Sequence, residues 1–276
     1  MKRLPILFLL LFAVSLSAQN RIDKSKQSLN EDKPAASNTE RNGAPEREKP
    51  EDDNVVSSLA EDAFMYTIGA IFKYGLIGDY GNEDHLYNDL TKYPFYETEA
   101  GNFYNPKFGE GSIYEFRVDV EDKFLYSNSD LFAKHLGVKI RPLHALHLEA
   151  EYYQLWEFQD TEGTSDRLSL FYFNFAYDRI RFERFNFGWT LGASYIGNDV
   201  NKAGFAFGLN ADYFLKKNIS FTAGANWSFI NGEKVHAYEA AVKTHRKNYF
   251  LSLGYERLEI AEPTYNFISL GGGIYF

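Results

Sequence analysis

Two residues of the chain, Asp119 and His135, are of the types that could carry out hydrolytic chemistry. A carboxylate that orients a histidine lets its imidazole act as a general base, provided that the two side chains lie within hydrogen-bonding reach. A hairpin that turns near Ser127 would place Asp119 opposite His135, near one rim of a sheet. No hydrolase motif surrounds the pair, so an enzymatic role stays open and a non-enzymatic one is favoured.

The same hairpin suggests an alternative in which these charges are structural. It would place Glu115 opposite Lys139, and a following turn within "RPLHA" would let Lys139 meet Glu149. Opposite charges on neighbouring strands form a salt-bridge ladder, which compensates charges that would otherwise be costly to enclose. The inward-facing residues expected to line such an interior are Glu115, Arg117, Asp119, His135, Lys139, Arg141, His147, Glu149 and Glu151.

Other chemistries find little support in the sequence. The six histidines lack a compact metal-ligand spacing, so no metal site is expected. "GGG" at 271–273 lies in an alternating segment, where it eases close packing rather than cradling a phosphate. The formal charge of −9 argues against nucleic acid as a partner, and no cofactor is expected.

The elements that must position these residues are strands. From Ser112 to the last residue, polar and apolar side chains alternate, as in "IYEFRVDV", "NFGWTLGASY" and "NISFTAGANWSF". This period of two predicts a sheet with one apolar and one polar face. The predicted strands are 112–121, 131–141, 146–158, 167–177, 184–196, 203–214, 218–229, 235–244, 248–258 and 264–276.

These segments have the length of strands that cross a bilayer at a tilt. After the first residues of the chain, no run approaches the roughly 18 apolar residues of a membrane-spanning helix. A sheet whose apolar face meets lipid cannot leave an unpaired edge, so it must close. The sequence therefore predicts an all-β, antiparallel, up-and-down transmembrane barrel of about ten strands over residues 112–276.

The last strand, "YNFISLGGGIYF", carries a more specific signal. Its outward positions Ile268, Leu270, Ile274 and Phe276 place apolar residues in alternation up to a final aromatic ring, although Gly272 interrupts them. This pattern resembles the C-terminal assembly signal of Gram-negative outer-membrane β-barrel proteins. The resemblance implies a location in the outer membrane, contact with its lipid bilayer, and recognition by the barrel assembly machinery.

The connections between strands fall into two groups. "RPLHA", "DRIRFE", "LKKN" and "THRK" carry basic residues, whereas "QDTEGTSD", "GNDVNKA", "INGEK" and "EIAEP" are acidic and richer in turn-forming residues. The two groups alternate along the chain, as expected for opposite sides of a membrane. The C-terminus and the basic turns are assigned to the periplasm.

Three segments precede the predicted barrel. Residues 1–18 have the layout of a secretory signal peptide, with Lys2 and Arg3 before an apolar run. Residues 19–57 are charged and contain no aromatic ring, which predicts a disordered periplasmic linker. Residues 58–111 are expected to hold a helix or a strand over 64–75, with helix favoured, and a long loop that could plug the barrel.

Small residues on the inward positions of the middle strands, such as Gly188, Gly192 and Gly208, face the charged wall. This arrangement predicts either a narrow pore for small solutes or a structural barrel with a salt-bridged interior. The alternative is an outer-membrane hydrolase that acts on lipid or peptide near the outer rim.

Overall fold

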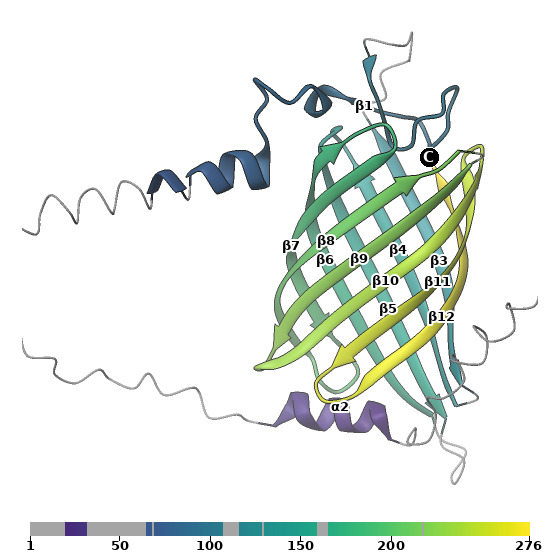
Figure 1. Ribbon diagram of the computed structural model, residues 1–276. Helices are drawn as coiled ribbons and strands as arrows, with labels where there is room; N and C mark the ends of the chain where they lie inside the picture. Colours follow the sequence, from purple (N-terminus) through teal and green to yellow (C-terminus); the bar gives the residue numbers. More distant parts are fainter. Residues whose placement is uncertain are drawn as a thin grey trace, which may run out of the picture.

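Ten antiparallel strands form a closed barrel in this computed structural model, which describes residues 20–31, 65–67, 69–106, 116–128, 130–158, 165–216 and 218–276. Each strand pairs with the next along the chain, and β12 pairs with β3 to complete the ring (Figure 1). The strands are β3 (Arg117–Asn128), β4 (Leu131–Arg141), β5 (Leu146–Phe158), β6 (Ser165–Arg181), β7 (Phe185–Ile196), β8 (Lys202–Phe214), β9 (Ile219–Ile230), β10 (Glu233–Arg246), β11 (Tyr249–Ile260) and β12 (Thr264–Tyr275). The predicted fold class is confirmed.

The first strand is the largest departure from the predicted bounds. It was expected over 112–121, whereas β3 runs over Arg117–Asn128. The charged triplet Glu121–Asp122–Lys123 looks like the end of an alternating segment, but the strand passes through it. Glu121 and Lys123 point inward to partners on other strands, and Asp122 points outward.

Inward and outward positions alternate as the period of two predicts. Large apolar side chains on the outward positions are exposed, including Phe124, Phe173, Leu209, Leu253 and Leu270. The outward ion pair Asp122–Lys134, at 3.2 Å, is an exception to this apolar surface. The sheet therefore presents a largely apolar outer wall and encloses polar and apolar side chains of its own.

The N-terminal linker prediction is wrong for residues 21–30. They form helix α2 (Arg21–Asn30), whose residues Ile22, Ser25 and Leu29 are buried. Helix α2 lies at the end of the barrel opposite the C-terminus (Figure 1). We call that end the helix end and the other the C-terminal end. Residues 19–57 were expected on the same side as the C-terminus, and α2 lies on the other.

Part of the predicted 58–111 region is described. Residues 65–67 and 69–70 are helical and lead into a π-helix over Ile71–Ile77, so the helical alternative applies there rather than the strand. A 3-10 helix (Asp84–Tyr87) and two short paired strands, β1 (Asp89–Leu90) and β2 (Phe103–Tyr104), follow. We call residues 79–106 the cap, because they lie against the C-terminal end.

No helix among the described residues is both long and apolar enough to cross a membrane. The predicted signal peptide over 1–18 and the residue Glu115 lie outside the described residues.

Candidate functional site

The barrel interior at the C-terminal end is crowded with charged side chains from several strands. Among the predicted inward residues, Arg117, His135, Arg141, His147 and Glu149 are buried. Asp119, Lys139 and Glu151 line an interior cavity beside them. We call this region the ionic half. Its charged members are Arg117, Asp119, Glu121, Lys123, His135, Lys139, Arg141, His147, Glu149, Glu151, Asp178, Asp212, Glu239, Lys243 and Glu256.

One ion network lies next to the C-terminal end. Arg117 donates to Asp119 through Nε and Nη2, at 2.7 and 2.9 Å. Arg141 lies between two carboxylates, with Nε 3.3 Å from Asp119 and Nη1 2.6 Å from Asp178. His147 contacts Asp178 at 3.2 Å. Each guanidinium thus has a carboxylate partner, as an enclosed charge requires.

The predicted contact between Lys139 and Glu149 is present at 2.8 Å, and the two residues are directly opposite in the β4–β5 ladder. Glu149 also accepts a hydrogen bond from His147 at 2.8 Å. Glu151, the next inward residue of β5, accepts one from the side-chain amide of Asn226 at 3.2 Å. A hydrogen bond therefore links β9, on the side of the barrel with small inward residues, to the charged residues of β5.

A second network lies deeper in the barrel, around Lys123. Its ammonium is 2.6 Å from Glu239 and 2.7 Å from Glu256, carboxylates that come from β10 and β11. Glu256 also contacts His135 Nδ1 at 2.9 Å, and the His135 ring stacks on Tyr153 with 3.9 Å between centroids. The network joins strands that are far apart in the sequence.

This second network is also the group of described residues whose geometry could hold a metal ion. Ligand atoms of His135, Glu239 and Glu256 all lie within 4.8 Å of one another. The Lys123 ammonium already contacts both carboxylates. A metal ion would have to displace it, so the ammonium itself supplies the compensating charge.

The predicted catalytic pair does not form. Asp119 is opposite Lys139 in the β3–β4 ladder, and His135 is opposite Lys123. Four residues along a strand separate the two positions by about 13 Å. Asp119 contacts two arginines and His135 contacts Glu256, so Asp119 does not orient the His135 ring.

A cavity of about 70 Å³ lies within the ionic half, with room for several water molecules. It reaches from Asn102 of the cap to Glu239, and Asp212 and Thr222 of the opposite wall line it. Asp212 accepts hydrogen bonds from Thr222 at 2.7 Å and Asn102 at 3.3 Å. The cavity is therefore polar, narrow and in contact with the cap.

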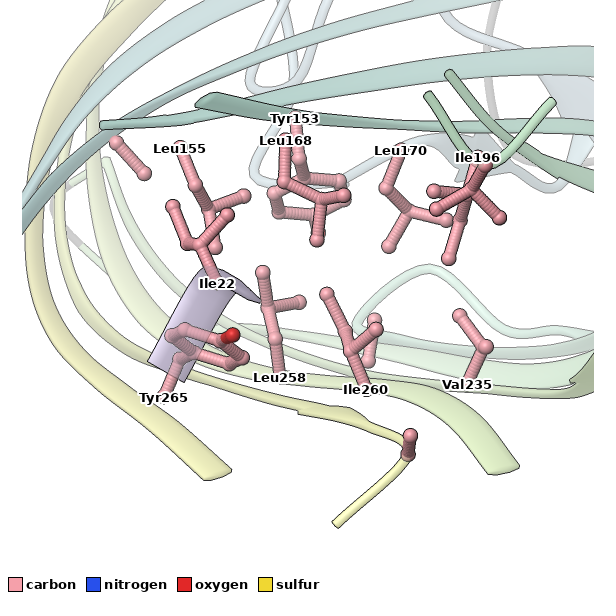
Figure 2. Close-up of a cluster of buried hydrophobic side chains, with 14 of the residues drawn as sticks. Ile22, Tyr153, Leu155, Leu168, Leu170, Ile196, Val235, Leu258, Ile260 and Tyr265 are labelled. Atoms are coloured by element: carbon pink, nitrogen blue, oxygen red, sulfur yellow. The ribbon is translucent and has the colours of Figure 1, made fainter. Parts of the chain in front are cut away.

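The helix end of the interior is apolar. Buried side chains from the strands and from α2 form one cluster there, and Figure 2 shows Ile22 of α2 among residues from opposite walls. We call this region the apolar half. It consists of Ile22, Leu29, Leu125, Leu131, Ala133, Tyr153, Leu155, Leu168, Leu170, Tyr172, Ile196, Val200, Ala206, Ile230, Val235, Ala237, Leu258, Ile260, Ala261, Tyr265 and Phe267.

A side chain of the barrel wall accepts hydrogen bonds from the N-terminus of α2. The first backbone N–H groups of a helix have no partner within the helix. Here the N–H groups of Arg21 and Ile22 donate to the Glu157 carboxylate, at 3.2 and 2.8 Å. A carboxylate at this position also interacts favourably with the helix dipole. Glu157 thus acts as an N-cap supplied by the barrel wall.

The middle and the C-terminus of α2 are held as well. Ser25 donates to the Ile260 carbonyl at 2.9 Å and shares a 2.8 Å hydrogen bond with Tyr265. The Leu29 carbonyl accepts from Lys202 and Asn231, each at 2.9 Å. Helix α2 is therefore docked by specific polar contacts as well as by its apolar face.

The cap is held to the other end through arginines of the barrel. Arg117 donates to the Thr91 carbonyl at 3.1 Å and to Asn102 at 2.9 Å. Arg179 donates to both carboxylate oxygens of Glu83, at 2.8 and 2.9 Å. The hydrogen bonds from Arg179 hold the pKa of Glu83 below its ordinary value, and burial lowers the pKa of His85.

Sequence reasoning missed several of these residues. Lys123, Glu239 and Glu256 carry the second network, and Glu157 caps α2. A signal was present for Lys123, because it shares parity with Asp119 and Glu121. The contacts that Glu239 and Glu256 make across the barrel depend on closure, which no local pattern specifies.

Comparisons with known proteins give similarity only at a low level. No family model matches the chain, and no curated protein matches it. An outer membrane channel from Pseudomonas putida F1 is similar at a TM-score of 0.38 and 10% identity, over 63% of this chain and 100% of that one. The outer membrane protein Ail of Yersinia pestis, in a phospholipid bilayer nanodisc, gives 0.35 and 11%, over 59% and 100%. The outer membrane protein OprG from Pseudomonas aeruginosa gives 0.31 and 10%, over 59% and 96%.

Proposed function

We propose that the protein is an integral outer-membrane β-barrel with a sealed interior, and that its role is structural rather than that of an open pore. The observation that carries this proposal is α2 seated in one mouth over a continuous apolar half. An apolar filling that leaves no polar path through it is a barrier to ions and polar solutes. At the other end, the cap and the paired charges of the ionic half fill much of the remaining space.

A membrane location is supported by the barrel wall itself. Exposed aromatic and aliphatic side chains cover the outward positions, and such a surface requires an apolar solvent. The outward positions of β12 continue this pattern, with Ile268, Leu270 and Phe276 exposed. We assign these residues, with the half-buried Ile274, to recognition by the barrel assembly machinery, on the resemblance of the last strand to that signal.

Arginine substitutions on the two faces of β8 test the membrane location. Leu209 faces outward and Asn210 inward. Leu209→Arg should cost about 2–4 kcal/mol of folding free energy near the middle of a bilayer. Asn210→Arg should cost much less, because it points into a polar interior. Folding titrations in lipid vesicles measure both, and equal losses would contradict the proposed facing.

A gated path for small solutes is the second candidate, favoured by the polar cavity of the ionic half. In this case α2 would be the gate, because it closes the end that the cavity does not reach. Deletion of residues 20–31 should then make vesicles that contain the protein permeable to small solutes. If the vesicles remained as impermeable to small solutes as those with the intact chain, only the structural role would be left.

A hydrolase role that uses Asp119 and His135 together is not supported, because these two described residues do not pair. Asp119 and His135 are engaged with other partners, as described above.

A further inference from the structure

Residues 65–77 form an apolar helical segment that lies outside the barrel. We call it the rim helix; its described residues 65–67 and 69–77 are helical. From Phe64 to Ile77 the sequence reads "FMYTIGAIFKYGLI", with Lys73 as its single charged residue. Figure 1 shows this segment extending sideways from the C-terminal end of the barrel. It is an apolar helix that points away from the protein.

The base of the rim helix is attached to the edge of the barrel wall. Trp189 of β7 donates from its indole N–H to the Leu76 carbonyl at 2.9 Å. Tyr177 donates to the Ile77 carbonyl at 2.5 Å, and Arg179 to the Tyr74 carbonyl at 2.7 Å. Trp189 shares the outward parity of the exposed Leu191. The rim helix thus ends on the outside of the wall, where the apolar outer surface meets the end of the barrel.

Large apolar side chains are exposed along the rim helix, from its first described residues to its base. Met65 is 65% exposed, Tyr66 81%, Tyr74 53% and Ile77 49%. The described side chains of this apolar segment are exposed or half-exposed along its length, and such a surface marks a site of contact with a protein or a membrane. The segment is too short to cross a bilayer, because a spanning helix needs about 20 apolar residues. A short apolar helix that meets a bilayer therefore lies in its interface rather than across it.

We propose that the rim helix is a membrane-surface helix that inserts its apolar side chains into the lipid leaflet at the C-terminal end of the barrel. This inference rests on the proposed membrane location. Continuity with the lipid-facing wall favours lipid as the partner, since Trp189 joins the two surfaces. Tyrosines are favoured at the boundary between headgroups and acyl chains. Lys73, 58% exposed and 3.7 Å from Asp79, can keep its ammonium among the headgroups.

The absence of cysteine from the chain allows a direct test with single labels. The variants are Tyr66→Cys on the rim helix, Leu209→Cys on the outer wall and Glu99→Cys in the cap, where Glu99 is 68% exposed. Each full-length mature variant is labelled with an environment-sensitive fluorophore and folded into phosphatidylethanolamine–phosphatidylglycerol vesicles. Spin-labelled lipids then quench labels in the bilayer, and iodide quenches labels in water.

The expected result is that lipid quenching at position 66 is several-fold stronger than at position 99 and comparable to that at position 209. Iodide should quench the label at 66 much less than the label at 99. Adding Met65→Asp to the Tyr66→Cys variant should reduce lipid quenching there and leave position 209 unchanged.

Two outcomes overturn the proposal while the barrel stays in the membrane. If iodide quenches the label at 66 as strongly as the label at 99, the rim helix lies in water. If neither quencher reaches it, a protein surface covers it, from a second copy or another partner. A label at 209 that iodide reaches and lipid does not would instead overturn the membrane location, and the rim-helix proposal with it.

Discussion

The two halves of the barrel interior are built from opposite kinds of contact. The ionic half is held by enclosed charges that come from strands far apart in the sequence, such as Lys123 of β3 with Glu239 of β10 and Glu256 of β11. The apolar half is held by aliphatic and aromatic side chains and is completed by α2, which belongs to another part of the sequence. Paired charges depend on every partner being present, whereas an apolar cluster tolerates small changes in each member. The two halves should therefore respond differently to substitution.

The largest effect is expected in the ionic half. Lys123→Met would leave the carboxylates of Glu239 and Glu256 without their ammonium partner. Removing one member of a buried ion pair costs about 3–5 kcal/mol. A folding titration in lipid vesicles measures the loss. Arg184→Met is the matched control, because Arg184 and Glu99 form an exposed pair, worth about 0–1 kcal/mol. Equal losses from the two variants would show that the Lys123 network contributes no more than a surface pair.

In the apolar half, the corresponding change is Ile22→Ala. It should weaken the docking of α2 by about 2–5 kcal/mol, because it removes a buried side chain and leaves a cavity. Hydrogen exchange at residues 21–30 should accelerate while exchange in the strands stays unchanged. Gln27→Ala, on the exposed side of α2, is the control and should leave exchange as it is. If exchange in the strands accelerated together with exchange in α2, the helix would not undock independently of the barrel, and this prediction would be wrong.

The polar contacts of α2 should matter less than its apolar face. Glu157→Gln keeps the side-chain shape but removes the charge that accepts the N–H groups of Arg21 and Ile22. The loss of docking free energy should be about 1 kcal/mol, as for other helix caps. The same exchange experiment measures it, with Glu259→Gln as a control, since Glu259 contacts Lys234 and Arg257 instead. A loss as large as that of Ile22→Ala would reverse this ranking.

The smallest effect concerns pH at the cap. Burial lowers the pKa of His85, so protonation below about pH 6.5 opposes the docked state. The hydrogen bonds from Arg179 lower the pKa of Glu83, so its contribution is present above its ordinary pKa and is lost as the pH falls through the lowered value. Acidification should therefore loosen the cap in two stages, measured by proteolysis of residues 79–106. His85→Gln should remove the stage at higher pH, which comes from His85. Slower proteolysis of the cap on acidification would contradict the prediction.

The sequence allowed the facing of the strands to be predicted, because parity is a local property of an alternating segment. Pairing between strands is less local. The first hairpin was expected to turn near Ser127, but the ladder passes through Asn128 opposite Leu131, with an irregularity after Tyr126. Moving a turn by two residues moves each partner by four, so Asp119 lies opposite Lys139 rather than His135. The catalytic hypothesis depended on that register.

Helix α2 could not be predicted for a different reason. Its composition is polar, and a short isolated helix of this kind is not stable in water. Ile22, Ser25 and Leu29 do share one face. That face is stabilised only when the end of the barrel supplies its partners, which include Glu157 and Tyr265. Tertiary contacts therefore decide the structure of a segment whose composition indicates disorder.

The most direct test of a sealed interior is the conductance of the chain from residue 19 onward in a planar lipid bilayer. With α2 docked over the apolar half, we predict insertion without steady conductance. A steady, ohmic current from the intact chain would contradict the account, because ions would then be crossing the region that the apolar side chains are proposed to close.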